Sequence, residues 1–316
     1  MSPNSTLSAQ KQSFFSRLGK DLKKHHGLYF LALPAVIALF FLNYVPMYGV
    51  IIAFKDYRPV LGIWGSEWAG LHNFERFFNS YQFKTILTNT IAVSFESLLF
   101  SFPIPIILAL LLNQIHRARL KKGIQTLVYL PHFISVVVMV SMVKLFLQPT
   151  LGLIGAVYNK LGISDVPNFM AMKTAFRPIF IISSIWQHAG WDSIIYIAAL
   201  SGIDPTLYEA AAMDGASKFQ RVLHIDLPGI LPTIVICLIL HVGKIMNVSF
   251  DRAYLLQNDL NISVSEIIQT YVYKLGIKQA QYSYSSVIGL FNNIVNLILL
   301  LIVNTISKKT TDTGLW

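Results

Sequence analysis

Long apolar runs alternate with shorter polar segments along most of the 316-residue chain. Runs of about 18 or more apolar residues with few charges are typical of helices that cross a membrane. The sequence predicts six such spans: Leu28 to Phe54, Ile86 to Leu112, Ile124 to Leu147, Pro178 to Leu200, Ile230 to Val248, and Ser286 to Ser307. The first run exceeds what a bilayer requires and contains Pro34 and Pro46, so we expect it to kink or tilt, or to end near Tyr44 with an external extension. The pattern predicts an all-α polytopic membrane protein.

A polar segment, residues 204–229, interrupts this pattern between the fourth and fifth spans. Asp204 can cap a short helix that has Pro205 at its first position and ends near Met213. Asp214-Gly215 then predicts a turn, because glycine accepts backbone angles that other residues resist. The second helix is expected to carry Phe219, Val222, Leu223 and Leu227 on one apolar side and to stop at Leu227-Pro228-Gly229. We therefore predict a helix–turn–helix with small alanines on its surface, suited to enter a groove of a partner.

The distribution of charge indicates orientation in a membrane and no nucleic-acid partner. Apolar residues make up 54% of the chain and charged residues 13%, the mean hydropathy is +0.56 and the net charge is +10. Basic residues gather beside the spans, in the tail 1–27 (Lys11, Arg17, Lys20, Lys23, Lys24), in the loop 113–123 (Arg117, Arg119, Lys121, Lys122), and at Lys308 and Lys309. Because Lys and Arg are enriched on the cytoplasmic side, both termini and the segment 204–229 are predicted inside. The connections 55–85, 148–177 and 249–285 are predicted outside.

Other features of the sequence say less about the fold and the function. The first apolar run is too long for a signal-peptide core, so no cleavable signal peptide is expected. Cys237 is the single cysteine, which excludes an intramolecular disulfide, and its place in a span predicts a small core residue. Residues 264–275 predict a short amphipathic helix. Aromatic residues of the first external segment predict a belt at the lipid headgroups or a platform for substrate: Phe74, Phe77, Phe78, Tyr81 and Phe83.

Ionisable residues inside the spans are functional candidates, because a charge in a bilayer is costly. They are Glu96, Lys144, His188, Asp192, His241 and Lys244. Lys144 lies near the outer end of its span and can extend its ammonium group to the interface, so we interpret it as structural. Glu96 keeps two interpretations, a partner on a neighbouring helix or a role in transport.

The polar segment carries a motif with a known counterpart. Its members are Tyr208-Glu209-Ala210-Ala211, Asp214-Gly215-Ala216, Phe219, Ile225 and Leu227-Pro228, and their order resembles the EAA loop of permease subunits of ABC importers. Further matches are Pro46-Met47-Tyr48-Gly49, Phe54-Lys55-Asp56, Tyr129-Leu130-Pro131-His132-Phe133-Ile134-Ser135, Gly190-Trp191-Asp192-Ser193-Ile194-Ile195-Tyr196 and Gln281-Tyr282-Ser283-Tyr284. These are similar to the polysaccharide-type branch of the sugar permeases. The resemblance covers the chain from about residue 28 to the terminal Leu315-Trp316.

The resemblance implies a type I ABC importer transmembrane domain over residues 28–316, after a basic cytoplasmic tail, 1–27. Spans two to six would form a MetI-like core, with span one packed outside it. Coupling to an ATPase is implied for Glu209, Ala210, Ala211, Asp214, Gly215, Ala216, Leu227 and Pro228. The implied activity is translocation of an oligosaccharide by alternating access in a bacterial plasma membrane. The chain itself would have no catalytic residue, metal or cofactor.

The partners that the resemblance implies complete an importer. Two ATPase subunits would bind ATP-Mg, because the chain contains no glycine-rich lysine loop of the Walker type. A second permease subunit, usually as a heterodimer, and an extracytoplasmic sugar-binding protein would join them in the lipid bilayer. The identity, length, linkage and charge of the sugar stay open.

Polar residues at helical spacing predict the sugar-binding face. Ser184, Gln187, His188 and Trp191 recur at i, i+3, i+4 and i+7 in span four, which places them on one face. Span five adds His241, Lys244 and Val248, with Asn247 on the flank, and span six adds Asn292, Asn293 and Asn296. Amides, charged groups and aromatic rings suit the hydroxyl groups and C–H faces of sugars. The alternative is hydrogen bonding between helices that holds the bundle or a partner subunit together.

Two other classes of function are disfavoured. A secondary carrier would have no use for a loop of the EAA type, and the sequence shows no internal inverted repeat. An intramembrane enzyme would need a motif such as His-Glu-x-x-His, Gly-x-Ser-x-Gly or paired aspartates, and Asp192 stands alone.

Overall fold

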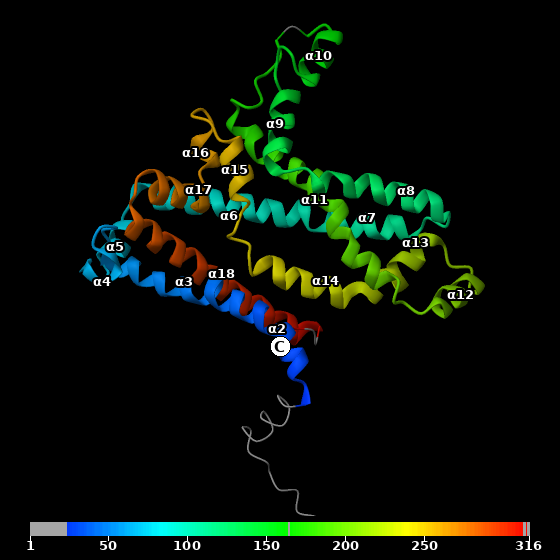
Figure 1. Cartoon of the computed structure of the whole chain (residues 1–316). Helices are drawn as coiled ribbons and strands as arrows, with labels where there is room; N and C mark the ends of the chain where they lie inside the picture. The colour runs from blue at the N-terminus through cyan, green and yellow to red at the C-terminus, as the bar shows by residue number, and fades with distance from the viewer. Residues whose placement is uncertain (1–23, 164, 312–313, 315–316) are drawn as a thin grey trace, which may run out of the picture.

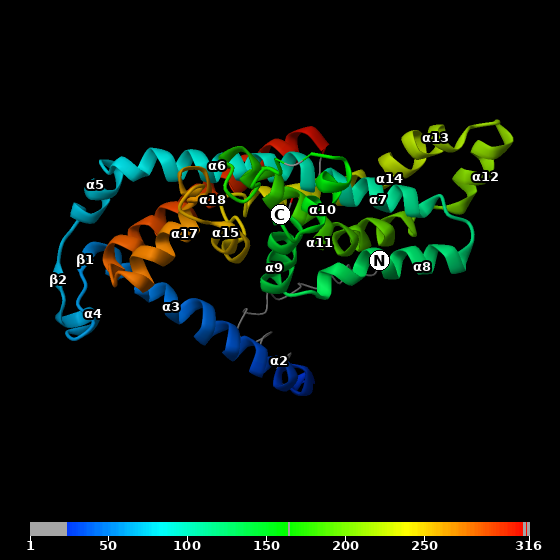
Figure 2. The same ribbon diagram turned by 90° about the horizontal axis from the view of Figure 1, so that it is seen from above.

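The computed structural model describes residues 24–163, 165–311 and 314, and most of them are helical (Figure 1). Most of the predicted basic tail and the terminal Leu315-Trp316 lie outside the described residues. Short helices α12 (Pro205–Met213) and α13 (Lys218–Arg221) lie at one end of the helical bundle, and α4 (Gly62–Gly65) and α5 (His72–Phe78) lie at the opposite end in both views (Figures 1 and 2). The segment 204–229 is therefore far from the connection 55–85, as the predicted topology requires.

The first span is one helical stretch from His26 to Phe54 with changes of helix type. It consists of α2 (His26–Leu39), a π-helical turn (Phe40–Tyr44), α3 (Val45–Met47) and a 3-10 segment (Tyr48–Phe54). The 3-10 segment packs against α18 (Tyr282–Thr311), whereas α2 extends away from the bundle in Figure 2 and buries no residue. An apolar helix that buries no residue is suited to contact lipid or another subunit.

The second and third spans differ in continuity. Helices α6 (Tyr81–Ser101) and α7 (Pro103–Asn113) together make one candidate span. The third was predicted as one helix from Ile124 to Leu147, and this is wrong, because α8 (Ala118–Tyr129) and α9 (Val136–Phe146) meet at an angle of 98°. A 3-10 turn, Leu130–Phe133, ends the first part, Ile134 is extended, and the Ser135 hydroxyl caps α9 by accepting from the Val138 N–H. Proline in the turn and a capping serine after it break the helix.

The central helix of the bundle is α11 (Phe176–Leu200), which packs against α6, α7, α8 and α14 (Leu227–Val242). Within the described residues, four helices are long and apolar enough to cross a membrane, and a fifth if the bent pair is one span. The 25 residues of α11 have the length, at about 1.5 Å rise per residue, but Gln187, His188 and Asp192 lower its hydropathy. The six-span count stays a prediction.

The connections predicted to be external contain short elements that the sequence predicted incompletely. In the first, a two-residue antiparallel ribbon pairs β1 (Lys55–Asp56) with β2 (Glu67–Trp68), next to α4 (Gly62–Gly65) and α5 (His72–Phe78). The chain is therefore not entirely α-helical. Another short helix, α10 (Leu153–Lys160), follows α9. Phe77 is fully buried against Phe83 and Phe291, so it is part of the core and not of a headgroup belt.

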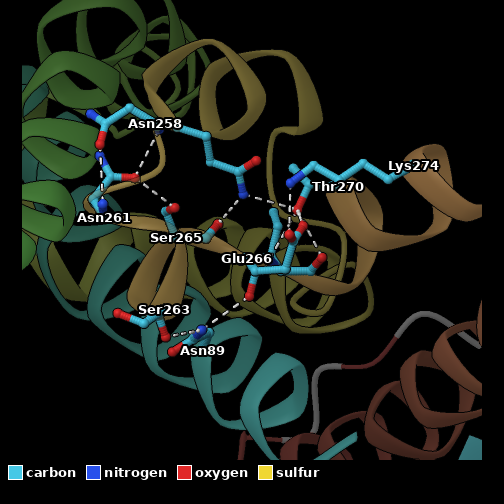
Figure 3. Close-up of polar contacts among 10 residues, drawn as sticks. Asn89, Asn258, Asn261, Ser263, Ser265, Glu266, Thr270 and Lys274 are labelled. Carbon is cyan, nitrogen blue, oxygen red and sulfur yellow. Dashed lines mark hydrogen bonds and ion pairs between the residues drawn. The ribbon is translucent and has the colours of Figure 1, made fainter. Parts of the chain in front are cut away.

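The connection 249–285, predicted to be external, folds back onto span two through a polar network (Figure 3). It contains α15 (Phe250–Leu256), α16 (Ile262–Ser265) and α17 (Ile268–Tyr273), so the single helix predicted over 264–275 is interrupted. The Asn89 side chain in α6 donates to the backbone oxygens of Ser263 and Glu266, each at 3.1 Å. Glu266 in turn pairs with Lys274 at 2.7 Å and accepts from the Thr270 hydroxyl at 2.6 Å. These bonds fix the connection to the N-terminal half of α6.

Glu96, whose role the sequence left open, has a partner on a neighbouring helix. Its carboxylate lies 2.9 Å from the Arg177 guanidinium at the start of α11. Both side chains are about one-third exposed (30% and 31%). The structure therefore supports the interhelical interpretation for Glu96.

Candidate functional site

The segment between spans four and five forms the predicted first helix and turn. Helix α12 (Pro205–Met213) begins at Asp204, whose carboxylate accepts from the Thr206 N–H at 2.9 Å. Hydrogen bonding from Thr206 lowers the pKa of Asp204. The turn places Gly215 at φ 73°, in the left-handed region that favours glycine. Ser217 then opens α13 (Lys218–Arg221) with a capping box to Gln220.

The second helix of the segment continues where the sequence predicted a stop. A π-helical turn, Val222–Asp226, joins α13 directly to α14, and Pro228 lies at the beginning of α14. Proline removes one backbone N–H and crowds the preceding turn, and a π-bulge changes the hydrogen-bond register at that point. The helix thus crosses Leu227-Pro228-Gly229 without ending, and α13 is continuous with span five.

The outer surface of this segment is exposed and partly apolar. Glu209, Ala210, Asp214 and Gly215 are exposed, and Ala211, Ala216 and Leu227 are half-buried. Met213 and Phe219 are 91% and 75% exposed. Large apolar side chains on an exposed helical corner are typical of a surface that another protein covers.

Two adjoining cavities lie between α6–α7, α11 and α14. One has a volume of about 440 Å³ and the other of about 520 Å³. Ser101, Asp192, Leu240 and His241 line both cavities. Both volumes fall within the usual range of small-ligand pockets, about 300–1,000 Å³.

The predicted binding residues divide between the cavities and the protein behind them. Five of the eight line the smaller cavity: Ser184, His188, His241, Lys244 and Asn247. Trp191 lines the larger one, with His241. Gln187 and Asn292 line neither; they are 2% and 5% exposed. The helical spacing therefore brought most of the set together, but not onto one open face.

The cavity end of span five differs from its prediction. Helix α14 ends at Val242 instead of Val248, so Lys244 and Asn247 lie in the turn that follows. Asn247 Oδ1 accepts from Asn292 Nδ2 at 2.7 Å and from Asn296 Nδ2 at 3.2 Å. Two asparagines of α18 therefore hold this turn, and Asn292 supports the cavity wall.

Gln187 connects three parts of the chain behind the wall. Its Nε2 donates to the Ile134 backbone oxygen at 2.7 Å, and its Oε1 accepts from Arg252 Nη2 at 2.5 Å. Arg252 is 1% exposed, donates also to the Ser183 hydroxyl at 3.0 Å, and lies 3.5 Å from His188 Nε2. No sequence pattern pointed to Arg252, because it lies in the connection 249–285 and outside any motif. Its role is recognisable only from its contacts in the folded chain.

The groups around the cavities suit a hydroxylated ligand. Ser184 supplies a hydroxyl, His188 and His241 supply imidazoles, and Lys244 and Asp192 supply opposite charges. The larger cavity adds the indole of Trp191 and is otherwise mostly apolar. Among the described residues, no group of three His, Cys, Asp or Glu side chains could hold a metal ion. The arrangement offers hydrogen bonds and an aromatic edge and is suited to binding.

Comparison with known proteins identifies the class to which this fold and site belong. Residues 101–312 match the model of the binding-protein-dependent transport system inner membrane component. The chain belongs to this family, the membrane permeases of ABC transporters. The prediction of an ABC permease is thereby confirmed.

Individual relatives place the chain near two proteins of Bacillus subtilis (strain 168). It is 44% identical to Protein LplB over 93% of this chain and 92% of the relative. It is 45% identical to the polygalacturonan/rhamnogalacturonan transport system permease protein YteP, over 95% of this chain and 93% of the relative.

The fold is also found in solved structures of a bacterial ABC transporter. One, of a transporter involved in the import of the acidic polysaccharide alginate, has a TM-score of 0.85 and 40% identity, over 93% of this chain and 99% of the other. Another, with an alginate pentasaccharide-bound periplasmic protein, has a TM-score of 0.86 and 39% identity, over 95% and 100%.

Proposed function

We propose that this chain is the membrane-spanning subunit of an ATP-driven importer that translocates an oligosaccharide delivered by an external binding protein. One observation carries the proposal. Helix α13, the second half of the exposed corner formed by α12 and α13, is continuous through an unbroken helix with α14, whose Leu240 and His241 line both cavities. A movement of α13 therefore reaches the cavity wall within one helix.

The mechanism follows from that continuity. ATPase subunits that close on ATP would grip the α12–α13 corner, with Glu209 facing a basic group and Met213 and Phe219 facing apolar surface. The corner would turn α14 against α11 and change the side from which the cavities are open. A second permease subunit would complete the pathway, and six spans in each chain would carry it across the plasma membrane, with both termini in the cytoplasm.

The substrate is proposed to be an oligosaccharide that contains carboxylate groups. Lys244 is exposed in the smaller cavity and forms none of the ion pairs found among the described residues. The positive charge of an ammonium group beside an apolar span is stabilised by a negatively charged ligand. The relative YteP is named for polygalacturonan and rhamnogalacturonan, and a similar structure belongs to an importer of an acidic polysaccharide. His188 and Ser184 would bind hydroxyl groups beside that carboxylate.

Reconstitution in proteoliposomes tests the proposal. The chain is assembled with the partner permease, ATPase subunits and binding protein encoded with it, and uptake of a uronate oligosaccharide is compared with uptake of a neutral one of equal length. We expect uptake that requires both ATP and the binding protein and favours the uronate. Glu209→Ala should abolish ATP-driven uptake while the loaded binding protein still docks. Uptake driven by an ion gradient without ATP would show a secondary carrier and overturn the proposal.

A further inference from the structure

A buried carboxylate joins the α12–α13 corner to two spans. Asp226, the last residue of the π-helical turn before α14, has no exposed surface. Its Oδ1 accepts from the Tyr208 hydroxyl at 2.5 Å and from Asn113 Nδ2 at 3.4 Å, and its Oδ2 accepts from Gln114 Nε2 at 3.0 Å. Tyr208 belongs to α12, whereas Asn113 and Gln114 end α7. The carboxylate thus receives hydrogen bonds from two other elements.

The donors that hold Asp226 are neutral. None of the ion pairs among the described residues includes Asp226. A buried charge without a counterion depends on its hydrogen bonds, and losing a donor leaves the charge unsatisfied in a medium of low dielectric constant. Burial and the bond to Asp226 raise the pKa of Tyr208 to about 12, so its hydroxyl keeps its proton at neutral pH. The bond therefore persists over the physiological range.

Apart from Tyr208, little of the surface of α12 is buried against the bundle. The helix buries no residue, and Tyr208 is one of its few half-buried side chains. The polar contact with Asp226 is therefore a main attachment of α12 to the bundle. Since α14 and the α6–α7 span both line the cavities, two of the elements joined at Asp226 contribute residues to the cavity walls.

We infer that Asp226 is a positioning residue that makes α12, the inner end of span two and the start of span five move as one unit during ATP-driven transport. The inference rests on the proposed function. It assigns to Tyr208 the specific role of passing a displacement of α12 to Asp226, and to Asn113 and Gln114 the role of passing it to span two. Glu209 and the exposed alanines would bind the ATPase, whereas Asp226 would transmit the movement inward.

The test measures sugar transported per ATP hydrolysed in the reconstituted complex. Tyr208→Phe removes one hydroxyl and retains the ring, so assembly and ATP hydrolysis should persist while the ratio falls at least about fivefold, the lower end of typical coupling between sites. Asp226→Asn should lower the ratio as well. In an Asp226→Asn background, Tyr208→Phe should have a smaller effect, because both changes remove the same charged contact. Tyr81→Phe is the matched control, since Tyr81 is 89% exposed on the external side, and its ratio should equal that of the wild type.

Two outcomes separate this inference from the proposed function. A merely structural role would lower the amount of complex and reduce uptake and hydrolysis in the same proportion, and an unchanged ratio in both Tyr208→Phe and Asp226→Asn would overturn the inference. A wild-type complex without ATP-dependent uptake would instead overturn the proposed function. If the Asp226→Asn complex fails to assemble, the transport-to-hydrolysis ratio of Tyr208→Phe alone decides whether the inference holds.

Discussion

The imidazole of His132 stacks on the indole of Trp191, with ring centroids 4.4 Å apart and planes 3° from parallel. His132 lies in the 3-10 turn that breaks span three, and Trp191 lies in α11. His132 Nδ1 is also 3.3 Å from His188 Nδ1. The break in span three is therefore held against one lining residue of each cavity, Trp191 of the larger and His188 of the smaller. One face of the indole is occupied by protein, so a sugar can contact only its edge or its other face.

Trp191→Ala should destabilise this junction as well as reduce sugar uptake. An aromatic pair contributes about 0.5–1.5 kcal/mol beyond its buried area. Thermal unfolding in detergent should show the loss, and Trp191→Phe should recover part of it by retaining a ring. His132→Ala should cause a similar loss. Strict additivity of the two alanine substitutions in a double-mutant cycle would show that the stack contributes nothing.

Gly215→Val should uncouple transport through backbone strain alone. A Cβ on Gly215 would meet nothing within 4 Å, but φ is 73°. The left-handed conformation costs residues with a Cβ about 1–2 kcal/mol, and asparagine tolerates it. ATP-driven uptake should fall in Gly215→Val and persist in Gly215→Asn. Equal uptake in the two variants would mean that the turn geometry is dispensable.

Gly190→Ala should prevent α8 from packing on α11. A Cβ on Gly190 would lie 1.9 Å from the backbone oxygen of Val128, and backbone cannot yield as a flexible side chain does. The yield of monodisperse protein and its unfolding temperature should both drop. Gly289→Ala in α18 is the matched control, because its Cβ would meet nothing within 4 Å and alanine favours a helix by about 0.5–1 kcal/mol. If both variants behave alike, the close approach at Val128 is not limiting.

The sequence predicted the features that rest on local chemistry. The Asp204 cap, Pro205 and Gly215 defined α12 and its turn to the residue, because caps and left-handed glycines are local. Apolar runs located the spans that pack as long helices. The EAA-like motif identified the family because its residues lie close together in the chain.

What the sequence could not give depends on contacts between distant segments. The bend at Leu130–Phe133 lies inside an apolar run, so the hydropathy pattern does not distinguish it from a straight span. Pro131 was the local sequence signal for the break. The helix across Pro228 continues because a π-turn accommodates the proline. Gln187 faces inward because Arg252, 65 residues away, donates to it. A helical wheel assigns residues to a face, but it does not show which neighbour covers that face.

The predicted topology can be tested by labelling single cysteines in a Cys237→Ser background. Cysteines at Lys122 and Ser217 should react only from the cytoplasmic side, and cysteines at Asn168 and Asp259 only from outside. All four positions are exposed in this chain, so in the chain labelled without its ATPase subunits failure to react reports sidedness and not burial. External reaction at Ser217 would contradict the proposed function, because α12 and α13 could then not meet an ATPase.

Substitutions of residues that line the cavity and of residues that support its wall should have different effects on transport. Ser184 and Lys244 line the smaller cavity, whereas Gln187 and Asn292 lie behind its wall and hydrogen-bond to Arg252, Ile134 or Asn247. Ser184→Ala and Lys244→Met should raise the sugar concentration for half-maximal uptake with assembly unchanged, since each removes a group that faces the ligand. A lost hydrogen bond costs about 0.5–1.5 kcal/mol, and a lost charged one about 1.5–3 kcal/mol. The effect of Lys244→Met should therefore be the larger, and larger for a uronate than for a neutral oligosaccharide.

Gln187→Leu should instead reduce the amount of folded complex, because the buried Arg252 guanidinium loses its acceptor at Gln187 and keeps the Ser183 hydroxyl as its other close acceptor. Asn292→Leu should loosen the turn at Asn247 in the same way. Uptake normalised to the amount of assembled complex should then be nearly normal at saturating sugar. The measurement is uptake as a function of sugar concentration, beside quantification of assembled complex, for all four variants. If Ser184→Ala and Lys244→Met leave both affinity and maximal rate unchanged, the sugar does not bind in this cavity. If Gln187→Leu changes affinity alone, Gln187 contacts the sugar in a conformation different from this one.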